Sequence, residues 1–357
     1  MFQELESKVR NTDYERLAIA ARMRSNQPRK TRIVLVASSR PSFVETDRQI
    51  LSADFEVRSI TWRGKRSIPR LAFAIVRSDL AFSWFALDHA YAACRLARAF
   101  RKKSLVVVGG IDAAKRADLE YGVHLNPTMG ARSVYTIAHT DRVLVVDDSL
   151  REEIAKNTGI QRADILTIPT GYDVDRFRPD GGPKTNVLTV GIVNDANLRR
   201  KGLWTFLQTA RLLPDIPFVL VGVRENQATR RLRAASPPNL RLEAEITADA
   251  LLEEYRRARV YVQLSLYEGL PNALAEAMSC GCLPVGTRVA GIPTLIGDSG
   301  FFVRPEDPEG TAETIGRSYA TADGARARDR IVKEFALDRR RKALSAVIES
   351  LVRGEGK

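Results

Sequence analysis

The chain has 357 residues and a net charge of +13, and 44% of its residues are hydrophobic while 28% are charged. That composition is ordinary for a globular protein of about two domains. It includes no run near the roughly 18 apolar residues that a membrane-spanning helix needs. Three cysteines exclude a disulfide framework, and the first residues lack the apolar core of a secretory signal, so we expect a cytoplasmic protein.

The positive charge is unevenly distributed, at +9 for residues 1–178 and +4 for residues 179–357. A basic surface attracts phosphate, nucleic acid or an anionic membrane, although an ordinary solvated surface explains the charge equally well. The stretch Arg63–Arg70, beside Trp62, is either an exposed loop or a contact with anionic lipid at the inner membrane face. No nucleic-acid partner is expected, because no basic-aromatic RNA motif or helix-turn-helix pattern occurs.

Residues 1–30 form a charged extension, after which strands and helices alternate. Short runs rich in β-branched residues predict buried parallel strands, and apolar residues at helical spacing predict helices. The predicted strands are Arg32–Ala37, Phe55–Trp62, Leu80–Trp84, Ser104–Val108 and Arg142–Val146, and the predicted helices are His89–Arg101 and Ser149–Asn157.

A Pro- and Gly-rich break at Arg178–Lys184 marks a domain linker. The alternation then restarts, with predicted strands at Val187–Val193, Phe218–Gly222, Val260–Gln263 and Leu283–Thr287, and predicted helices at Gly202–Leu213, Ala248–Arg257, Pro271–Ser279 and Asp338–Leu351. We therefore expect two tandem doubly wound α/β domains. The predicted divisions are residues 1–30, 31–178, 179–335 and 336–357.

Ligands of such sheets bind beyond the carboxyl ends of the strands, so two facing domains predict a site in the cleft between them. No G-x-G-x-x-G follows a predicted strand, and no G-x-x-x-x-G-K-[ST] occurs. These absences argue against a dinucleotide-dependent dehydrogenase and a P-loop nucleotidase.

The segment Leu266–Gly281 carries the strongest chemical pattern. A strand ends, a turn follows, and Pro271 suits the first turn of a helix that ends at Gly281. Gly269 allows close approach of a ligand to the backbone, and the free N–H groups of the helix start form an anion site. Carboxylates at Glu268 and Glu276 can each accept hydrogen bonds from vicinal hydroxyls. A sugar joined to a diphosphate would satisfy both features.

Glu268, seven residues, Glu276 and then A-M-S-C-G-C-L-P-V resemble the signature of family-4 retaining glycosyltransferases, which have the two-domain GT-B fold. Further matches follow in the family's order, namely I-P-T-G-Y-D-V-D-R-F-R-P at Ile168–Pro179, the strand-loop Val190–Gly202 that ends in Lys-Gly, A-G-I-P at Ala290–Pro293 and F-A-L at Phe335–Leu337. The resemblance is strong from Ile168 onward and weak before it.

The resemblance implies a GT-B-like fold whose first domain binds the acceptor, whose second domain binds the donor, and whose last helix crosses back to the first domain. The donor would be a UDP- or GDP-sugar, and the acceptor a glycan, a lipid-linked intermediate or a small molecule. No cofactor and no metal would be needed. The roles implied for single residues are ribose binding by Glu276, contact with the transferred sugar by Glu268, neutralisation of the diphosphate by Lys201, and backbone contacts by Gly269, Leu270, Pro271 and Asn272.

Two positions depart from the family pattern. Where many relatives have His-Gly-x-Asp, this chain has Gly109-Gly110-Ile111-Asp112, so no catalytic histidine is assigned. Asp112 is then either a catalytic residue or the cap of a following helix. A second cation near Lys201 would come from Arg199 or Arg200, of which Arg200 is taken as the donor-binding candidate.

Several alternatives stay open. The missing histidine fits a catalytically inactive GT-B protein that binds a nucleotide sugar as a scaffold or regulator. Asp173 and Asp175 spell the D-x-D of metal-dependent glycosyltransferases, but they lie inside the I-P-T-G-Y-D stretch and are interpreted as linker structure. Cys280 and Cys282 are too few for a zinc site.

Overall fold

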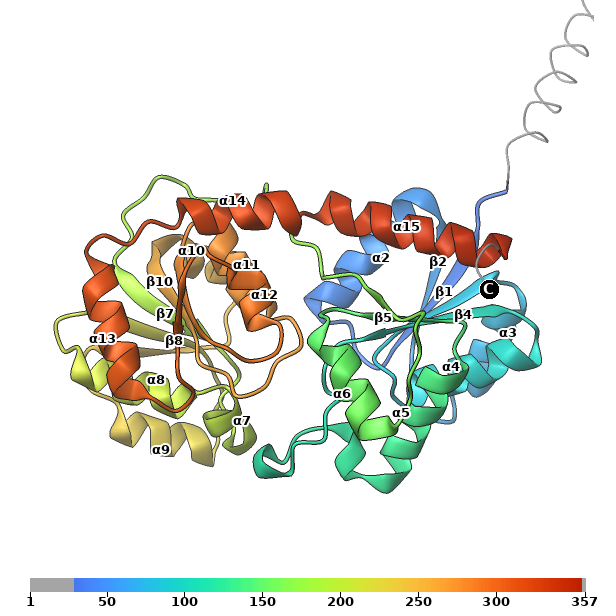
Figure 1. Cartoon of the computed structure of the whole chain (residues 1–357), viewed down its shortest axis with the longest axis horizontal. Coiled ribbons are helices and arrows are strands. Elements are labelled where there is room, and N and C mark those ends of the chain that lie inside the picture. The colour runs from blue at the N-terminus through green and yellow to red at the C-terminus, as the bar shows by residue number, and fades with distance from the viewer. Residues whose placement is uncertain (1–28, 355–357) are drawn as a thin grey trace, which may run out of the picture.

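The computed structural model describes residues 29–354, which form two α/β domains joined by two crossings of the chain (Figure 1). The first domain contains a six-stranded sheet in the order β2-β1-β3-β4-β5-β6, in which all pairs are parallel. Its elements are β1 (Arg32–Ala37), α2 (Ser42–Asp54), β2 (Glu56–Thr61), α3 (Ile68–Val76), β3 (Leu80–Trp84), α4 (Asp88–Ala99), β4 (Lys103–Val108), α5 (Pro127–His139), β5 (Arg142–Val145), α6 (Ser149–Thr158) and β6 (Leu166–Thr167).

The second domain repeats this design with a parallel sheet in the order β12-β11-β10-β7-β8-β9. Its elements are β7 (Asn186–Val190), α7 (Asp195–Arg200), α8 (Leu203–Leu212), β8 (Phe218–Val223), α9 (Gln227–Ala235), β9 (Leu240–Ala244), α10 (Ala248–Arg257), β10 (Ala258–Gln263), α11 (Asn272–Ser279), β11 (Leu283–Thr287), α12 (Ile292–Ile296), β12 (Phe301–Val303), α13 (Pro308–Tyr319) and α14 (Ala325–Glu334), and the chain then returns to the first domain as α15 (Leu337–Arg353).

The predicted fold class is confirmed, because both sheets are parallel and doubly wound. The central strands are buried on both faces, which is why they form almost uninterrupted apolar runs. Several elements were not predicted from the sequence, among them α2, α3, α5, β9 and α14. One predicted feature differs in detail, since Pro271 is the residue before α11 and the helix begins at Asn272.

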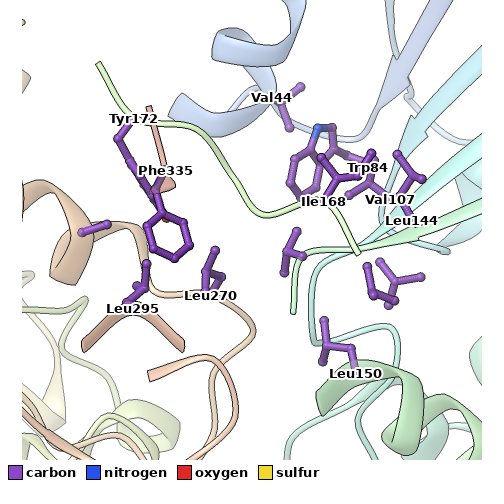
Figure 2. Packing of buried hydrophobic residues seen from close by; sticks show 14 of the residues in the cluster. Val44, Trp84, Val107, Leu144, Leu150, Ile168, Tyr172, Leu270, Leu295 and Phe335 are labelled. Atoms are coloured by element: carbon purple, nitrogen blue, oxygen red, sulfur yellow. The ribbon is translucent and has the colours of Figure 1, made fainter. Parts of the chain in front are cut away.

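Two chain segments cross between the domains and pair with each other. Tyr172 donates its N–H to the Phe335 carbonyl at 2.8 Å, and the Leu337 N–H donates to the Tyr172 carbonyl at 3.0 Å. Figure 2 shows Tyr172 and Phe335 beside each other, with Leu270 and Leu295 below them. All four belong to one buried apolar cluster that also includes core residues of the first domain. The crossing is therefore a packed junction rather than a free linker.

The last helix, α15, is anchored to α2 of the first domain by a buried ion pair. Arg340 contacts both carboxylate oxygens of Asp47, at 2.6 and 2.7 Å, and both side chains are almost fully buried. Arg340 also donates to the carbonyls of Ile168 and Pro169 in the first crossing segment. Asp47 in turn accepts the indole N–H of Trp84 at 2.8 Å. One guanidinium thus ties together the helix, the crossing segment and a residue at the end of β3.

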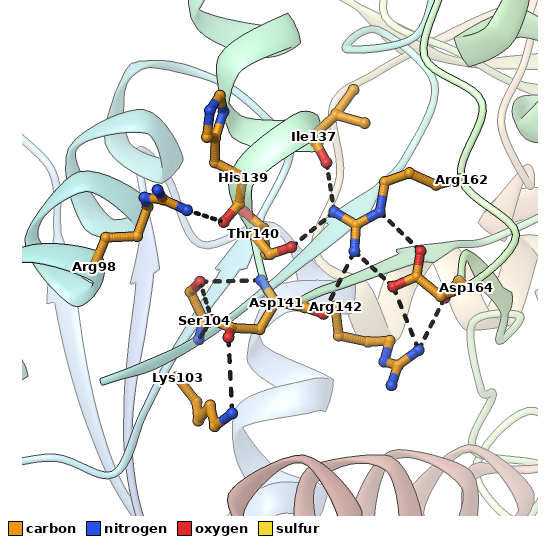
Figure 3. Close-up of polar contacts among 10 residues, drawn as sticks. All are labelled: Arg98, Lys103, Ser104, Ile137, His139, Thr140, Asp141, Arg142, Arg162 and Asp164. Carbon is orange, nitrogen blue, oxygen red and sulfur yellow. Dashed lines mark hydrogen bonds and ion pairs between the residues drawn. The ribbon is translucent and has the colours of Figure 1, made fainter. Parts of the chain in front are cut away.

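Part of the positive charge of the first domain is structural. Arg162 donates to the carbonyls of Ile137 and Thr140 at 2.8 and 2.7 Å, which are acceptors left open where α5 ends. It also pairs with Asp164, which in turn contacts Arg142 (Figure 3). These contacts fix the turn into β5, away from the carboxyl ends of the strands. Within residues 29–354, no helix is both long and apolar enough to cross a membrane.

Candidate functional site

A cavity of about 540 Å³ lies between the domains, at the carboxyl ends of both sheets. This is the position that the two-domain arrangement predicts for a ligand. First-domain residues on its surface lie at or after the carboxyl ends of β1, β3, β4, β5 and β6, and second-domain residues lie at or after those of β7 and β10. The lining residues are Ser38, Ser39, Phe43, Trp84, Phe85, Leu87, Gly109, Ile111, Tyr121, Val146, Thr170, Val190, Lys201, Gln263, Glu268, Gly269, Leu270, Pro271, Asn272 and Ala273.

The turn between β10 and α11 brings its backbone into this cavity. Gly269, Leu270, Pro271 and Asn272 all line the cavity directly before or at the start of α11. No side chain caps the N-terminus of the helix, so its first N–H groups remain available to an anion. A side chain at Gly269 would collide with the Gly109 carbonyl, because an added Cβ would lie 2.0 Å from that oxygen. The turn therefore requires glycine there.

Lys201 and Glu268 form an ion pair on the cavity surface. The lysine Nζ lies 2.5 Å from Glu268 Oε1, and the same oxygen accepts hydrogen bonds from Ser265 Oγ at 2.8 Å and Gln263 Nε2 at 3.3 Å. Among the described residues, Glu268 Oε2 has no hydrogen-bond partner. Lys201 likewise keeps two of its three protons free. The pair can therefore offer a ligand both an acceptor for hydroxyls and donors for a phosphate.

Glu276 lies in a neighbouring hollow of about 240 Å³, which shares Phe43 and Asn272 with the larger cavity. Its Oε2 accepts a hydrogen bond from the Tyr255 hydroxyl at 2.9 Å. Its Oε1 has no partner among the described residues. Burial raises the pKa of Glu276 to about 7, against the lowering effect of the Tyr255 hydrogen bond. The hollow and the cavity together could hold a ligand with two parts, and Asn272 would lie between them.

Asp112 is fully buried and does not line the cavity. Its carboxylate accepts backbone N–H groups of Ala86 at 2.8 Å and of Gly109 and Gly110 at 3.0 Å each. Burial raises its pKa to about 6, and these three hydrogen bonds oppose the rise. The carboxylate thus holds together the two loops that follow β3 and β4, and no helix cap is involved.

Neither Arg200 nor Arg199 lines the cavity, and both contact first-domain residues. The Arg200 guanidinium is buried over the ring of Tyr121 at 4.4 Å and donates to Asn197 Oδ1 at 2.6 Å. Arg199 pairs with Glu306 and donates to the Asp118 carbonyl. The structure does not bring Arg200 together with Lys201 at the cavity surface. It places Arg200 in the contact between the domains.

The first-domain side of the cavity contains residues that the sequence interpretation missed. Phe43, Trp84 and Phe85 form an aromatic cluster there. The three residues come from α2, the end of β3 and the following loop, so no sequence spacing connects them. A bulky aromatic pair at the carboxyl end of a predicted strand was the only available signal.

The possible metal motifs have other roles or no metal-binding arrangement. Asp173 accepts the backbone N–H groups of Asp175 and Arg176 and so stabilises a turn of the crossing segment. Cys280 and Cys282 are buried free thiols. In the described part of the chain, no group of three or more His, Cys, Asp or Glu side chains is arranged to hold a metal ion.

Comparison with known proteins gives two family matches. Residues 20–176 match the model for Glycosyltransferase Family 4, and residues 184–321 match the model for Glycosyl transferases group 1. Among curated proteins, the chain is 24% identical over 218 residues to a phosphatidylinositol N-acetylglucosaminyltransferase subunit of Arabidopsis thaliana, covering 56% of this chain and 45% of the relative. It is 25% identical over 232 residues to D-inositol 3-phosphate glycosyltransferase of Mycolicibacterium gilvum, covering 58% and 51%.

The curated relatives are thus matched over about half of their length or less. Solved structures agree in fold over nearly the whole chain. Sucrose-phosphate synthase from Thermosynechococcus elongatus has a TM-score of 0.73 at 17% identity, covering 91% of this chain and 100% of that one. Anabaena HepE, in complex with UDP and glucose, has a TM-score of 0.75 at 12% identity, covering 90% and 100%. The chain therefore belongs to the group 1, family-4 glycosyltransferases and has their two-domain GT-B fold.

Proposed function

We propose that the protein is a retaining glycosyltransferase that moves a sugar from a UDP- or GDP-sugar to a glycan, lipid-linked or small-molecule acceptor. The observation that carries the proposal is the Lys201–Glu268 pair beside the uncapped start of α11, with Glu276 in the adjoining hollow. This combination offers donors to a diphosphate and acceptors to the hydroxyls on either side of it. A structural relative was solved with UDP and glucose, which supports the same class of donor.

Each donor part has a matching protein group in this proposal. The diphosphate lies at the start of α11 and takes hydrogen bonds from Lys201 Nζ and the helix N–H groups. The free Oε2 of Glu268 accepts from the hydroxyls of the transferred sugar. The free Oε1 of Glu276 accepts from the ribose hydroxyls in the smaller hollow. Backbone atoms of Leu270 and Pro271 shape the passage between these points.

The transfer then needs one bond to form and one to break. The acceptor hydroxyl oxygen bonds to the anomeric carbon, and the bond from that carbon to the diphosphate oxygen breaks. The departing diphosphate takes the hydroxyl proton, and attack on the face it leaves retains the anomeric configuration. Lys201 and the helix start stabilise the negative charge that develops on the diphosphate, which is an electrostatic form of catalysis. No metal is required in this scheme, so activity should persist in excess EDTA.

Asp112 has a positioning role in this proposal rather than a catalytic one. Its carboxylate is occupied by three backbone N–H groups and has no access to the cavity. Arg200 is likewise assigned to the contact with Tyr121 instead of the donor. Both proposals differ from the roles that the sequence suggested.

The direct test is incubation with a panel of UDP- and GDP-sugars and a mixture of glycan and membrane-lipid acceptors, with release of UDP or GDP as the readout. Turnover that is lost in Lys201→Ala and kept in EDTA supports the proposal. Absence of nucleotide binding in the wild-type protein would refute it.

A second candidate is a protein that binds a nucleotide sugar without turnover. It is favoured by Gly109, which stands where many relatives have histidine, and by the ring of Phe85 beside it. Tight binding of UDP or GDP with no transfer to any acceptor fraction would support this alternative. Transfer to a single acceptor is enough to exclude it.

A further inference from the structure

The first-domain side of the main cavity is uncharged. Among the described residues, the charged side chains that line this cavity are Lys201 and Glu268, which both come from the second domain and pair with each other. We call the first-domain side the acceptor wall. It consists of Ser38, Ser39, Phe43, Trp84, Phe85, Leu87, Gly109, Ile111, Tyr121, Val146 and Thr170.

The centre of the acceptor wall is a fixed aromatic surface. The ring centroids of Phe43 and Trp84 lie 4.7 Å apart, and Phe85 lies 5.8 Å from Phe43 and 5.7 Å from Trp84. Trp84 is held from behind by Asp47, which accepts its indole N–H and is itself paired with Arg340. The aromatic surface is therefore ordered before a ligand arrives.

Phe85 is held in a conformation that bulky residues rarely adopt. Its φ is 63°, in the left-handed region that L-residues with large side chains avoid. Its ring fills the space beside Gly109, since a Cβ added there would lie 2.4 Å from Phe85 Cε1. Strained backbone of this kind is concentrated at functional sites. The loop thus presents an aromatic ring to the cavity at the place where many relatives have a histidine.

We propose that the acceptor wall binds an uncharged sugar ring, with the apolar face of the ring against Phe85 and Phe43. This rests on the proposed function, which places the donor on the opposite side of the cavity. An aromatic face suits the C–H face of a sugar, and the hydroxyls of Ser38, Ser39 and Thr170 can hydrogen-bond its edge.

Charge selects against a phosphorylated acceptor at this position. None of the acceptor-wall residues is a cation. The guanidinium groups behind the wall, Arg200 over Tyr121 and Arg340 over Trp84, donate to Asn197 and Asp47. In the proposed complex, Lys201 is engaged by Glu268 and the donor diphosphate. An acceptor phosphate would have to shed water without a compensating partner, which is unfavourable. It would also lie close to the donor diphosphate, a group of the same charge.

The test compares methyl glycosides of glucose, galactose, mannose and N-acetylglucosamine with the 6-phosphates of the same sugars. Binding to the full chain is measured by saturation-transfer NMR and tryptophan fluorescence, with and without UDP or GDP. We expect at least one methyl glycoside to bind, and its phosphorylated counterpart to bind at least about tenfold more weakly.

Variants assign the binding to the acceptor wall. Phe85→Ala should weaken glycoside binding about tenfold and leave UDP or GDP binding unchanged. Phe43→Ala provides a second variant at the same surface should Phe85→Ala fold poorly. Phe73→Ala is the matched control, because Phe73 is an exposed phenylalanine on α3 outside the cavity, and it should change neither measurement.

The outcomes separate this inference from the proposed function. If UDP or GDP binds, three results would overturn the acceptor inference alone. They are the absence of glycoside binding, equal or tighter binding of the sugar phosphates, and glycoside binding that is unchanged in both Phe85→Ala and Phe43→Ala. Phe85-dependent glycoside binding without any UDP or GDP binding would leave the subsite in place and overturn the proposed donor.

Discussion

Glu276 combines partial burial, a hydroxyl partner and one free oxygen. Because burial raises its pKa to about 7, the ionised form that accepts ribose hydroxyls becomes populated only near neutral pH. Affinity for UDP or GDP should therefore increase from about pH 6 to about pH 8. Glu276→Gln should bind weakly at both values. Calorimetric titration at the two pH values measures this, and a pH-independent affinity in the wild type would contradict the assignment.

The same carboxyl affects the stability of the ligand-free protein. A folded-state pKa above the unfolded value gives a contribution to stability that is lost as pH rises through about 7. Glutamine does not ionise, so Glu276→Gln lacks this pH-dependent loss of stability. Its melting temperature relative to that of the wild type should therefore be higher above pH 7 than near pH 5. Thermal unfolding across this pH range provides the check. A variant that loses stability relative to the wild type at high pH would show that Glu276 is not held as described.

Gly109 and Phe85 are predicted to be coupled. A side chain at residue 109 must displace the Phe85 ring, so Gly109→His should destabilise the fold by about 1–3 kcal/mol, the usual cost of overpacking. In a Phe85→Ala background the same change should cost less. Denaturant unfolding of the four proteins gives the coupling energy. Gly316→His, at an exposed helix position, serves as the control. If the changes in unfolding free energy of the two single variants simply add in the double variant, the side chains at residues 109 and 85 do not compete for the same space.

At the scale of elements, α15 is predicted to depend on one buried arginine. Arg340→Ala leaves Asp47 buried without its cation, which should cost about 3–5 kcal/mol. The adjacent Arg341 pairs with Asp54 at a more exposed position, and Arg341→Ala should cost about 1 kcal/mol or less. Denaturant unfolding of the two variants compares them directly. Equal losses would show that the buried pair is not what fastens α15 to α2.

Elements with a continuous apolar pattern were predictable from the sequence, and those without one were not. β3 is buried throughout and β4 is buried except at Lys103, and both are predicted as strands. Helix α5 was missed because its buried face consists of Gly130, Ser133, Thr136 and Ile137, which give no apolar stripe. In α14 only Ala327 and Ile331 are buried, too few to define a helical period.

Part of the candidate site could likewise be predicted from the sequence, and part could not. Glu268 to Glu276 form one continuous segment, so spacing and resemblance could place them together. Spacing and resemblance could not predict the acceptor wall, because Phe43 and Phe85 belong to different elements that only the folded sheet brings together. The structure does not place Arg200 on the cavity surface beside Lys201. Its guanidinium lies over the ring of Tyr121, a contact that adjacency in the sequence does not predict.

At the scale of the whole molecule, the proposed donor site requires that the two domains stay in contact. The crossing segments pair at Tyr172 and Ala336, and a second contact joins Tyr267 and Gly110 beside the cavity. A nucleotide that bridges the cavity and the Glu276 hollow binds only the folded, assembled form, so it should raise the melting temperature.

The measurement that tests the central claim most directly is calorimetric titration of UDP and GDP into four proteins, the wild type, Lys201→Ala, Glu276→Ala and the exposed control Lys342→Ala. We expect one nucleotide to bind the wild type and Lys342→Ala equally, and to bind Lys201→Ala and Glu276→Ala at least about tenfold more weakly. Equal binding by all four proteins would contradict the proposed donor site.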